Sequence, residues 1–362
     1  MSHPEFIRKR LQETTLGTAL LVVLSWVYGG VMLLRRYLYQ WRILPSKKLH
    51  ARTICIGNLT TGGTGKTSAV LLAADTLHKN EIKVAILSRG YNRPDKTRDI
   101  HVLVDGKDTS WLQAGDEPWM MHQILKGMDI PILVGPDRYK AGVEAMHYYH
   151  PQVLLMDDGY QHHHLRRDLD ILLINATDPF GGGRMLPAGN LREPVSGVKR
   201  ARVVILTQSD RVSKEELEKL QETIHKLNPR AKILEAVHKP SVLLDLRTEQ
   251  KKRLHHLKGK KIACFCALGD PKSFEEQLKD AGAEIVQAWR FPDHHRFELG
   301  EIHSIENVRA GVPVVTTFKD APRLPPNWRD VLTGEVLAMG ARLEITQGKD
   351  VWEAELCKGI RG

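Results

Sequence analysis

The stretch GNLTTGGTGKT at residues 57–67 decides the fold class of this chain. It follows the apolar run 53–56 and opens a helix-like run, so a strand, a glycine-rich turn and a helix N-terminus form a cradle of backbone N–H groups for phosphate oxygens. Lys66 is placed to reach the outer phosphates, and Thr67 to hold Mg²⁺. Thr60 stands where the G-x-x-x-x-G-K-[ST] pattern has its first glycine. The pattern predicts a P-loop with these phosphate-binding residues: Thr60, Thr61, Gly62, Gly63, Thr64, Gly65, Lys66 and Thr67.

Length and composition describe a folded protein with more than one core. The chain has 362 residues, of which 42% are hydrophobic and 27% charged, and a chain of this length predicts two domains. The four cysteines lack zinc-site spacing, so we expect reduced thiols in a cytosolic compartment. Cys264 and Cys266 fit alternation on a buried strand better than a redox pair.

The N-terminal segment is both basic and apolar. The net charge of the chain is +10, and residues 1–52 hold nine Lys or Arg against two Glu. Between the basic clusters, residues 17–34 carry no charge and, as a helix, would span about 27 Å, slightly less than a bilayer core of about 30 Å. Aromatic residues that favour the membrane interface lie within or beside this run: Trp26, Tyr28, Tyr37, Tyr39 and Trp41.

Several interpretations fit this segment. A cleaved signal peptide lacks its small-residue cleavage site, and Ser25, Gly29 and Gly30 weaken a full transmembrane span. A buried core helix is a further alternative. We favour a helix seated in or on an anionic membrane surface, held by apolar burial and by Lys/Arg attraction.

The rest of the chain alternates short apolar runs with helix-like stretches, which predicts parallel sheets covered on both faces. Expected strands are 52–57, 83–88, 131–135, 153–157, 170–175 and 202–207, and expected helices are 66–79, 115–127, 138–149 and 213–227. The charged stretch 246–261 is interpreted as a linker. A second, smaller α/β unit follows, with strands at 261–267, 283–289, 312–317 and 336–346 and helices at 271–281 and 299–309.

We therefore expect an α/β protein with two three-layer α/β/α units. The domains are a membrane-associated helix at 1–45, a P-loop domain at 46–240 and a smaller C-terminal α/β domain at 241–362.

Two acids follow the apolar strand 153–156. Asp157 and Asp158 at a strand end beside a P-loop are typical of a Walker B element, which binds Mg²⁺ directly or through water. A turn that merely prefers Asp and Gly is the alternative.

Other polar segments offer further candidates. Asp116 caps a helix or acts on a proton together with a His of the FPDHH segment 291–295. Arg192 is suited to transferring phosphoryl oxygens, and Glu193 to a metal, unless the loop 187–194 is only salt-bridged. Three consecutive histidines, 162–164, cannot easily ligate one ion, because neighbours on an extended chain face opposite ways.

Together these segments resemble the tetraacyldisaccharide 4′-kinases, the lipid A 4′-kinases of Gram-negative bacteria. The similar segments run in order from about residue 20 to 320: LSWVYGG at 24–30, GNLTTGGTGKT at 57–67, SRGY at 88–91, AGDEP at 114–118, DRYKAG at 137–142, DDGYQHHHL at 157–165, LPAGNLREP at 186–194, FPDHH at 291–295 and the region of Lys319 and Asp320. Any one of them is weak, but the eight from 57–67 onward, in order, are specific.

The resemblance implies transfer of the ATP γ-phosphoryl group to the 4′-hydroxyl of a tetraacylated disaccharide 1-phosphate, in a cleft between two domains. Asp116 would deprotonate the sugar hydroxyl, paired with His294. Lys66 and Arg192 would stabilise phosphoryl charge. Mg²⁺ would be held by Thr67, Asp158 and Glu193, with Asp157 in the same metal and water network.

The implied partners are an acylated disaccharide lipid and an anionic membrane surface, with no nucleic acid, and we expect a monomer at the cytoplasmic face of the bacterial inner membrane. Two other classes stay open. The first is a membrane-bound nucleotide switch or metallochaperone, because the loop also resembles that of dimeric P-loop ATPases and GTPases. The second is a non-catalytic membrane-surface module.

Overall fold

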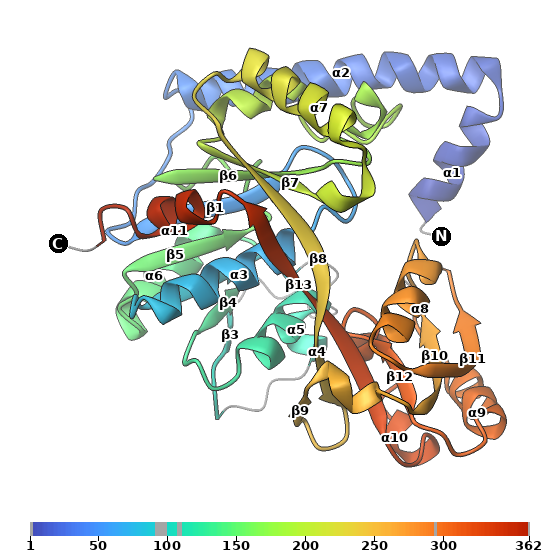
Figure 1. The fold of residues 1–362 in the computed structure, drawn as a ribbon. Coiled ribbons are helices and arrows are strands. Elements are labelled where there is room, and N and C mark those ends of the chain that lie inside the picture. Colours follow the sequence, from blue (N-terminus) through green and yellow to red (C-terminus); the bar gives the residue numbers. More distant parts are fainter. Residues whose placement is uncertain (1–2, 91–99, 107–110, 293–294, 361–362) are drawn as a thin grey trace. The chain divides into compact units, whose positions relative to one another are not determined.

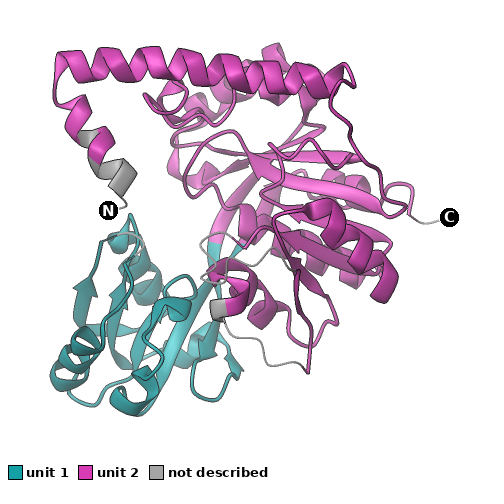
Figure 2. Ribbon diagram, turned by 180° about the vertical axis from the view of Figure 1, so that it is seen from behind, with its two compact units in different colours: residues 1, 239–342 teal, residues 2–238, 343–362 magenta. Residues whose placement is uncertain are grey.

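The computed structural model of the chain describes residues 3–90, 100–106, 111–292 and 295–360. The chain forms two compact units, shown in different colours in Figure 2. The smaller unit is residues 239–342, and the larger unit combines residues 2–238 with 343–362. Two long strands, β8 (Lys232–Asp245) and β13 (Val336–Gln347), contain the boundaries, so both ends of the chain belong to the larger unit.

The larger unit is built on a mostly parallel sheet (Figure 1), in the order β8-β7-β6-β1-β5-β2-β4-β3. Within this order of described strands, β3 pairs antiparallel with β4, and the other neighbouring pairs are parallel. Apolar strands that pair in parallel need helical crossovers, which cover both faces of a sheet. The remaining strands are β1 (Arg52–Asn58), β2 (Val84–Ser88), β3 (His101–Leu103), β4 (Ile132–Val134), β5 (Val153–Asp157), β6 (Leu169–Asn175) and β7 (Val203–Thr207).

Each face of this sheet has its own apolar core. Ile54 and Ile56 of β1 pack on one face, whereas Cys55 packs on the other, as strand alternation requires. The first face is covered by α3 (Lys66–Lys79), α5 (Asp116–Leu125) and α11 (Lys349–Cys357). The second is covered by α6 (Arg138–Tyr148) and α7 (Lys214–Leu227), completing three layers. The short helix α4 (Trp111–Ala114) precedes α5.

Two helices precede the sheet: α1 (His3–Gln12) and the long α2 (Thr15–Gln40). Thr14 caps α2 by accepting a hydrogen bond from the Gly17 amide. By length and composition α2 is able to cross a membrane. Its buried residues are Gly17, Leu21, Ser25 and Gly29, which recur every four positions and so form one face.

The opposite face of α2 is apolar and exposed. Its residues recur every three or four positions, so they form a single stripe along the helix. The outer stripe, as we call it, consists of Leu16, Leu20, Val23, Val27, Val31, Leu34, Tyr37 and Trp41, the last just beyond the helix end.

The smaller unit is a second α/β layer structure. Its strands lie in the order β11-β10-β12-β13-β8, with the short β9 (Lys251–Lys252) antiparallel to β8. The strands β10 (Lys261–Cys266), β11 (Glu284–Arg290) and β12 (Val314–Thr317) are parallel neighbours. Helix α8 (Pro271–Asp280) packs on this sheet through Phe274 and Leu278. Two further helices, α9 (Leu299–Val308) and α10 (Trp328–Val331), belong to the same unit.

The α/β class and the parallel sheet cores are confirmed, and helix 66–79 and strand 153–157 begin and end where predicted. The linker prediction for 246–261 is wrong, because this stretch folds within the smaller unit, where Lys252 pairs with Asp245 at 2.9 Å and with Glu335. The expected domain 241–362 also differs at its end, since α11 packs with the larger unit through the buried Trp352.

The cysteines behave as core residues. Cys55, Cys264 and Cys266 are buried, and all four described cysteines are free thiols. Burial raises the pKa of Cys264 to about 12 and that of Cys266 to about 11. Such thiols stay protonated and unreactive near neutral pH.

Candidate active site

The glycine-rich loop lies between β1 and α3, at the carboxyl end of the sheet. Gly62 and Gly65 have left-handed φ angles of +110° and +82°, which glycine adopts without strain. The Thr207 hydroxyl at the end of β7 donates to the Thr64 carbonyl at 3.2 Å. Helix α3 then begins at Lys66, so its unpaired N–H groups and positive dipole end meet the loop.

A second loop, residues 184–196, supports the start of the P-loop, and we call it the catalytic loop. The Arg192 amide donates to the Leu59 carbonyl at 2.7 Å, and the Thr61 amide to the Asn190 carbonyl at 2.7 Å. Thr60 and Leu191 form an antiparallel bridge between these contacts. The two loops are thus fixed in register, which places Arg192 beside the phosphate cradle.

Three charged side chains meet at this point. The Arg192 guanidinium donates to both carboxylate oxygens of Asp158, at 3.0 and 2.9 Å, and Lys66 Nζ lies 3.9 Å from the same carboxylate. Burial alone would raise the pKa of Asp158, but Lys66 and Arg192 lower it below its usual value. Burial lowers the pKa of Lys66. Two cations thus gather around one acid, which leaves positive charge for an anionic ligand.

The neighbouring Asp157 has a different environment. It is 5% exposed and accepts a hydrogen bond from the Ser88 hydroxyl at 3.2 Å. Burial and the charges of Glu117 and Asp158 raise the pKa of Asp157 to about 7. Carboxylate oxygens are the ligands that Mg²⁺ prefers, and Asp157 and Asp158 lie side by side at the end of β5, so the donors at this site fit Mg²⁺.

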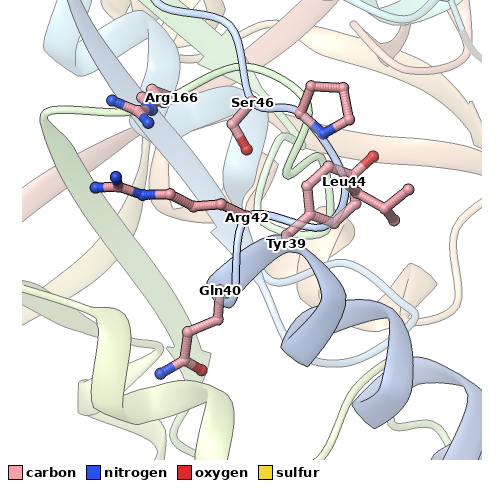
Figure 3. Close-up of a pocket in the computed structure, with 7 residues that line it drawn as sticks. Tyr39, Gln40, Arg42, Leu44, Ser46 and Arg166 are labelled. Atoms are coloured by element: carbon pink, nitrogen blue, oxygen red, sulfur yellow. The ribbon is translucent and has the colours of Figure 1, made fainter.

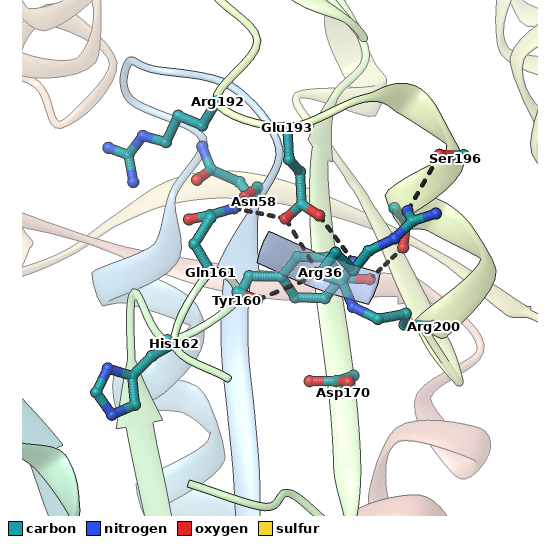
Figure 4. A network of polar contacts seen from close by, with 12 residues as sticks. Arg36, Asn58, Tyr160, Gln161, His162, Asp170, Arg192, Glu193, Ser196 and Arg200 are labelled. Atoms are coloured by element: carbon teal, nitrogen blue, oxygen red, sulfur yellow. Dashed lines mark hydrogen bonds and ion pairs between the residues drawn. The ribbon is translucent and has the colours of Figure 1, made fainter. Parts of the chain in front are cut away.

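Glu193 occupies a separate ion pair (Figure 4), in which Arg200 donates to its two oxygens at 2.7 and 3.1 Å. Gln161 Nε2 also donates to Glu193 at 2.8 Å and to the Asn58 carbonyl at 2.8 Å. The guanidinium of Arg200 also lies 4.3 Å from the ring centroid of Tyr160. Both oxygens of Glu193 are thereby engaged, which ties the catalytic loop to the end of β1.

The GDEP segment starts helix α5, whose first turn contains Asp116 and Glu117. Glu117 acts electrostatically on both Asp157 and Lys66, which places this turn near the P-loop. His294 lies outside the described residues, so its pairing with Asp116 stays a prediction.

The three consecutive histidines take different neighbours. The His163 ring lies tilted against Tyr39, with ring centroids 5.5 Å apart, whereas His164 meets Tyr139 edge to face at 6.3 Å. Burial and nearby arginines lower the pKa of His162 to about 4 and that of His163 to about 3. Within the described parts of the chain, no group of three His, Cys, Asp or Glu is arranged to hold a metal ion, and the metallochaperone hypothesis gains no support.

Helices α1 and α2 contact the catalytic loop directly. The Tyr28 hydroxyl donates to the Arg192 carbonyl at 3.1 Å, and Arg36 donates to the Ser196 hydroxyl at 3.1 Å (Figure 4). Gly29 faces Met185. From α1, Arg8 donates to the Asn190 side chain at 2.9 Å.

Sequence reasoning missed several residues near the site: Tyr28, Ser88, Glu117, Arg200 and His238. The ring of His238 lies only 2.6 Å from the position that a Cβ at Gly65 would occupy. Its position depends on pairing between β7 and β8, which no local sequence signal reveals. The sequence carries only a weak signal for Arg200. A basic residue seven positions after Glu193 is able to form an ion pair with it.

A glycine-rich loop at a helix N-terminus, with a lysine and a strand-end carboxylate beside it, defines a P-loop phosphotransferase. The LpxK family model, described as tetraacyldisaccharide-1-P 4′-kinase, matches residues 17–360. The chain therefore belongs to this family, and it is an ATP-dependent kinase of lipid A biosynthesis.

Individual relatives agree with the family. A tetraacyldisaccharide 4′-kinase of Elusimicrobium minutum is 42% identical over 96% of this chain and 92% of the relative. One from Halothermothrix orenii is 36% identical over 83% of this chain and 82% of the relative. The crystal structure of LpxK from Aquifex aeolicus in complex with ATP matches with a TM-score of 0.75 and 30% identity, covering 95% of this chain and 99% of that one.

Proposed function

We propose that this chain transfers the γ-phosphoryl group of ATP to the 4′-hydroxyl of a tetraacyldisaccharide 1-phosphate at the site built around Lys66, Asp158 and Arg192. The observation that carries the proposal is the convergence of these three side chains beside the P-loop. Phosphoryl transfer depends on positioning and on charge stabilisation, which two cations beside a backbone N–H cradle supply.

We assign the phosphates of ATP to residues 60–67, since the Aquifex aeolicus relative is in complex with ATP. Lys66 contacts the outer phosphates, and Arg192 moves from Asp158 to the transferring group. Asp116 accepts the proton of the sugar hydroxyl, and His294 pairs with it. The support for Asp116 is its place in the first turn of α5, near Lys66.

Mg²⁺ would be held by Thr67 and Asp158, with Asp157 in the same network, and when bound it offsets phosphate charge. Arg192 competes with the ion for Asp158, because it donates to both carboxylate oxygens. Arg200 competes in the same way for Glu193.

We further propose that the enzyme works as a monomer on the cytoplasmic surface of the bacterial inner membrane, with the outer stripe of α2 in the lipid. One face of α2 packs on the larger unit through Leu21, Ser25 and Gly29, while the outer stripe is apolar and exposed. A helix with one apolar exposed face and one face packed on protein suits the membrane interface better than a lone span.

The decisive assay combines protein, labelled ATP, Mg²⁺ and the lipid disaccharide in detergent. We expect a phosphorylated lipid as product. A nucleotide switch would consume ATP without labelling the lipid, and an inert module would do neither.

Asp116→Asn tests the proton acceptor, and Asp75→Asn, at a half-buried position of α3 where it pairs with Lys79, is the matched control. We expect Asp116→Asn to lower kcat by about 10²–10⁴-fold with nearly unchanged ATP affinity. His294→Ala should give a smaller loss. Wild-type turnover of Asp116→Asn would remove this residue from the reaction.

A further inference from the structure

A pocket lies at the C-terminal end of α2 (Figure 3), just beyond Arg36, which contacts Ser196 at the end of the catalytic loop. Its volume is about 390 Å³, and it is lined by Tyr39, Gln40, Arg42, Leu44, Pro45, Ser46 and Arg166. Tyr28, the α2 residue that contacts Arg192, precedes Gln40 by twelve positions, which is about 18 Å along a helix. The pocket is therefore not a part of the phosphoryl-transfer site.

The walls of the pocket are fixed by backbone contacts between residues distant in sequence. The Lys47 amide donates to the His164 carbonyl at 2.8 Å, and the Arg166 amide to the Lys47 carbonyl at 2.8 Å. The Ser46 hydroxyl donates to the His163 carbonyl at 2.8 Å. This pairing holds the segment after α2 beside the segment after β5, and brings Arg42 and Arg166 to one pocket.

The two arginines carry unneutralised charge. Across the described ranges, no carboxylate pairs with the guanidinium of Arg42 or of Arg166, whereas the adjacent Arg167 lies 3.1 Å from Asp170. Figure 3 shows both guanidinium groups extending to the same side of the pocket. Two arginines on one side of a pocket suit a phosphate, which accepts paired N–H groups.

The backbone at Arg42 forms the turn that ends α2. Arg42 has a φ of +60°, in the left-handed region where a residue with a Cβ is strained by about 1 kcal/mol or more. Glycine or asparagine would occupy this position at lower cost. A left-handed residue directly after a helix end is common, and here it turns the chain from α2 into the segment that lines the pocket.

The surroundings indicate where the phosphate comes from. Trp41 and Ile43, on either side of Arg42, are 65% and 64% exposed, and Trp41 continues the outer stripe of α2. Tyr37 stacks on Trp41 with ring centroids 5.4 Å apart. Aromatic residues beside cations at the end of an apolar helix are typical of the headgroup level of a bilayer.

We infer that this pocket binds the phosphate of an anionic membrane phospholipid, separately from the substrate. The inference rests on the proposed membrane association, and it adds a lipid-selective site that fixes the end of α2 at headgroup level. Phosphate contacts come from Arg42 and Arg166, while Trp41 and Ile43 enter the adjacent lipid.

The test measures co-sedimentation with vesicles of phosphatidylcholine alone or with added phosphatidylglycerol, at physiological salt. The key variant is Arg42→Lys/Arg166→Lys, which keeps the charge but loses paired N–H geometry. Arg42→Gln/Arg166→Gln also removes the charge. Lys83→Gln/Arg230→Gln is the control, since it removes two exposed cations elsewhere on the larger unit.

We expect the wild type to prefer anionic vesicles. The Lys pair should lose about fivefold in affinity and the Gln pair about tenfold or more, while the control stays within about twofold. Kinase activity in detergent should be unchanged in all variants, which also verifies folding. If the Lys pair bound vesicles as tightly as the wild type, the proposed phosphate site would be refuted. Binding would then come only from nonspecific attraction between basic residues and anionic lipid.

Two further results identify other sources of phosphate. ³¹P NMR titrations compare inorganic phosphate with soluble short-chain phosphatidylglycerol. Equally tight binding of the two would refute the assignment of the pocket to a lipid. A raised KM for the lipid disaccharide in the Gln pair would mean that the pocket holds the substrate. Equal binding to both vesicle types would refute the pocket but not membrane association, whereas no binding to either would refute both.

Discussion

The guanidinium of Arg192 donates hydrogen bonds to both carboxylate oxygens of Asp158, at 3.0 and 2.9 Å. The residue expected to stabilise the phosphoryl group is thus paired with the residue expected to hold Mg²⁺. Under the proposed mechanism this pair opens when the nucleotide binds, because Arg192 turns to the transferring phosphoryl group and leaves the Asp158 carboxylate to the ion. Substitution of Arg192 should therefore have two opposite effects: slower phosphoryl transfer and tighter binding of Mg²⁺.

Arg192→Ala should lower kcat by about 10²–10³-fold, because the charge on the transferring group loses a positioned donor. The same variant should bind Mg²⁺ more tightly without nucleotide, since Asp158 is freed. Phosphotransfer kinetics and calorimetric Mg²⁺ titration measure the two effects. Arg184→Ala, an exposed arginine on the same loop, is the matched control, and unchanged Mg²⁺ affinity in Arg192→Ala would contradict the competition.

Tyr28→Phe removes the hydrogen bond from α2 to the Arg192 carbonyl. A net contribution of about 0.5–1.5 kcal/mol predicts a fall in kcat of about 2- to 12-fold in detergent, with ATP affinity unchanged. Tyr37→Phe removes the same hydroxyl from the exposed face of α2 and should have no effect. Equal kinetics for the two variants would show that α2 does not position the catalytic loop.

Gly65→Ala adds a methyl group at a left-handed residue, 2.6 Å from the ring of His238. The loop must shift, or His238 must move, and we expect ATP affinity to fall by about tenfold or more, measured with a fluorescent ATP analogue. Gly106 has a similar φ angle, +80°, but a Cβ there would stand in open space. The Gly106→Ala variant is therefore the control and should bind ATP normally. Normal binding by Gly65→Ala would argue against a phosphate at this turn.

Glu355 ties α11 to the sheet, with its carboxylate 2.8 Å from Lys232 and hydrogen-bonded to Arg202. Burial alone would raise its pKa, but Arg202 and Lys232 lower the pKa of Glu355 to about 2. A depressed pKa stabilises the fold above the unfolded value near 4, and this stability is lost as the pH falls toward 2. Glu355→Gln should therefore lower the free energy of unfolding by about 1–3 kcal/mol at pH 7.

The difference between Glu355→Gln and the wild type should narrow as the pH falls from about 5 to about 3, measured by urea denaturation. Glu222→Gln, on the exposed side of α7, is the control and should differ little at any pH. A difference that stays constant down to pH 3 would mean that the ion pairs contribute nothing.

The elements set by local pattern were predictable from sequence. Helix 66–79 begins after a glycine and carries an apolar face, and strand 153–157 is a continuous apolar run that ends in acids. Their boundaries depend on nearby residues alone. The P-loop and the Asp157–Asp158 pair followed for the same reason.

Long-range pairing was not predictable. The return of the chain at residue 343 depends on Trp352 packing beside α3, far away in sequence. The partner of Glu193 was equally hidden, because Arg200 reaches it only through a short 3₁₀ helix at 195–200. Which carboxylates pair with arginine and which face the P-loop is a property of the assembled sheet.

The two faces of α2 have a practical consequence for making a soluble enzyme. Deleting residues before the first strand would leave the Arg192 carbonyl, Met185 and Ser196 without the neighbours that α2 provides. We expect such a truncated enzyme to lose activity, because these contacts support the loop that contains Arg192. Replacing Leu20, Val27 and Val31 by polar residues is the better engineering route, because these side chains lie on the exposed outer stripe.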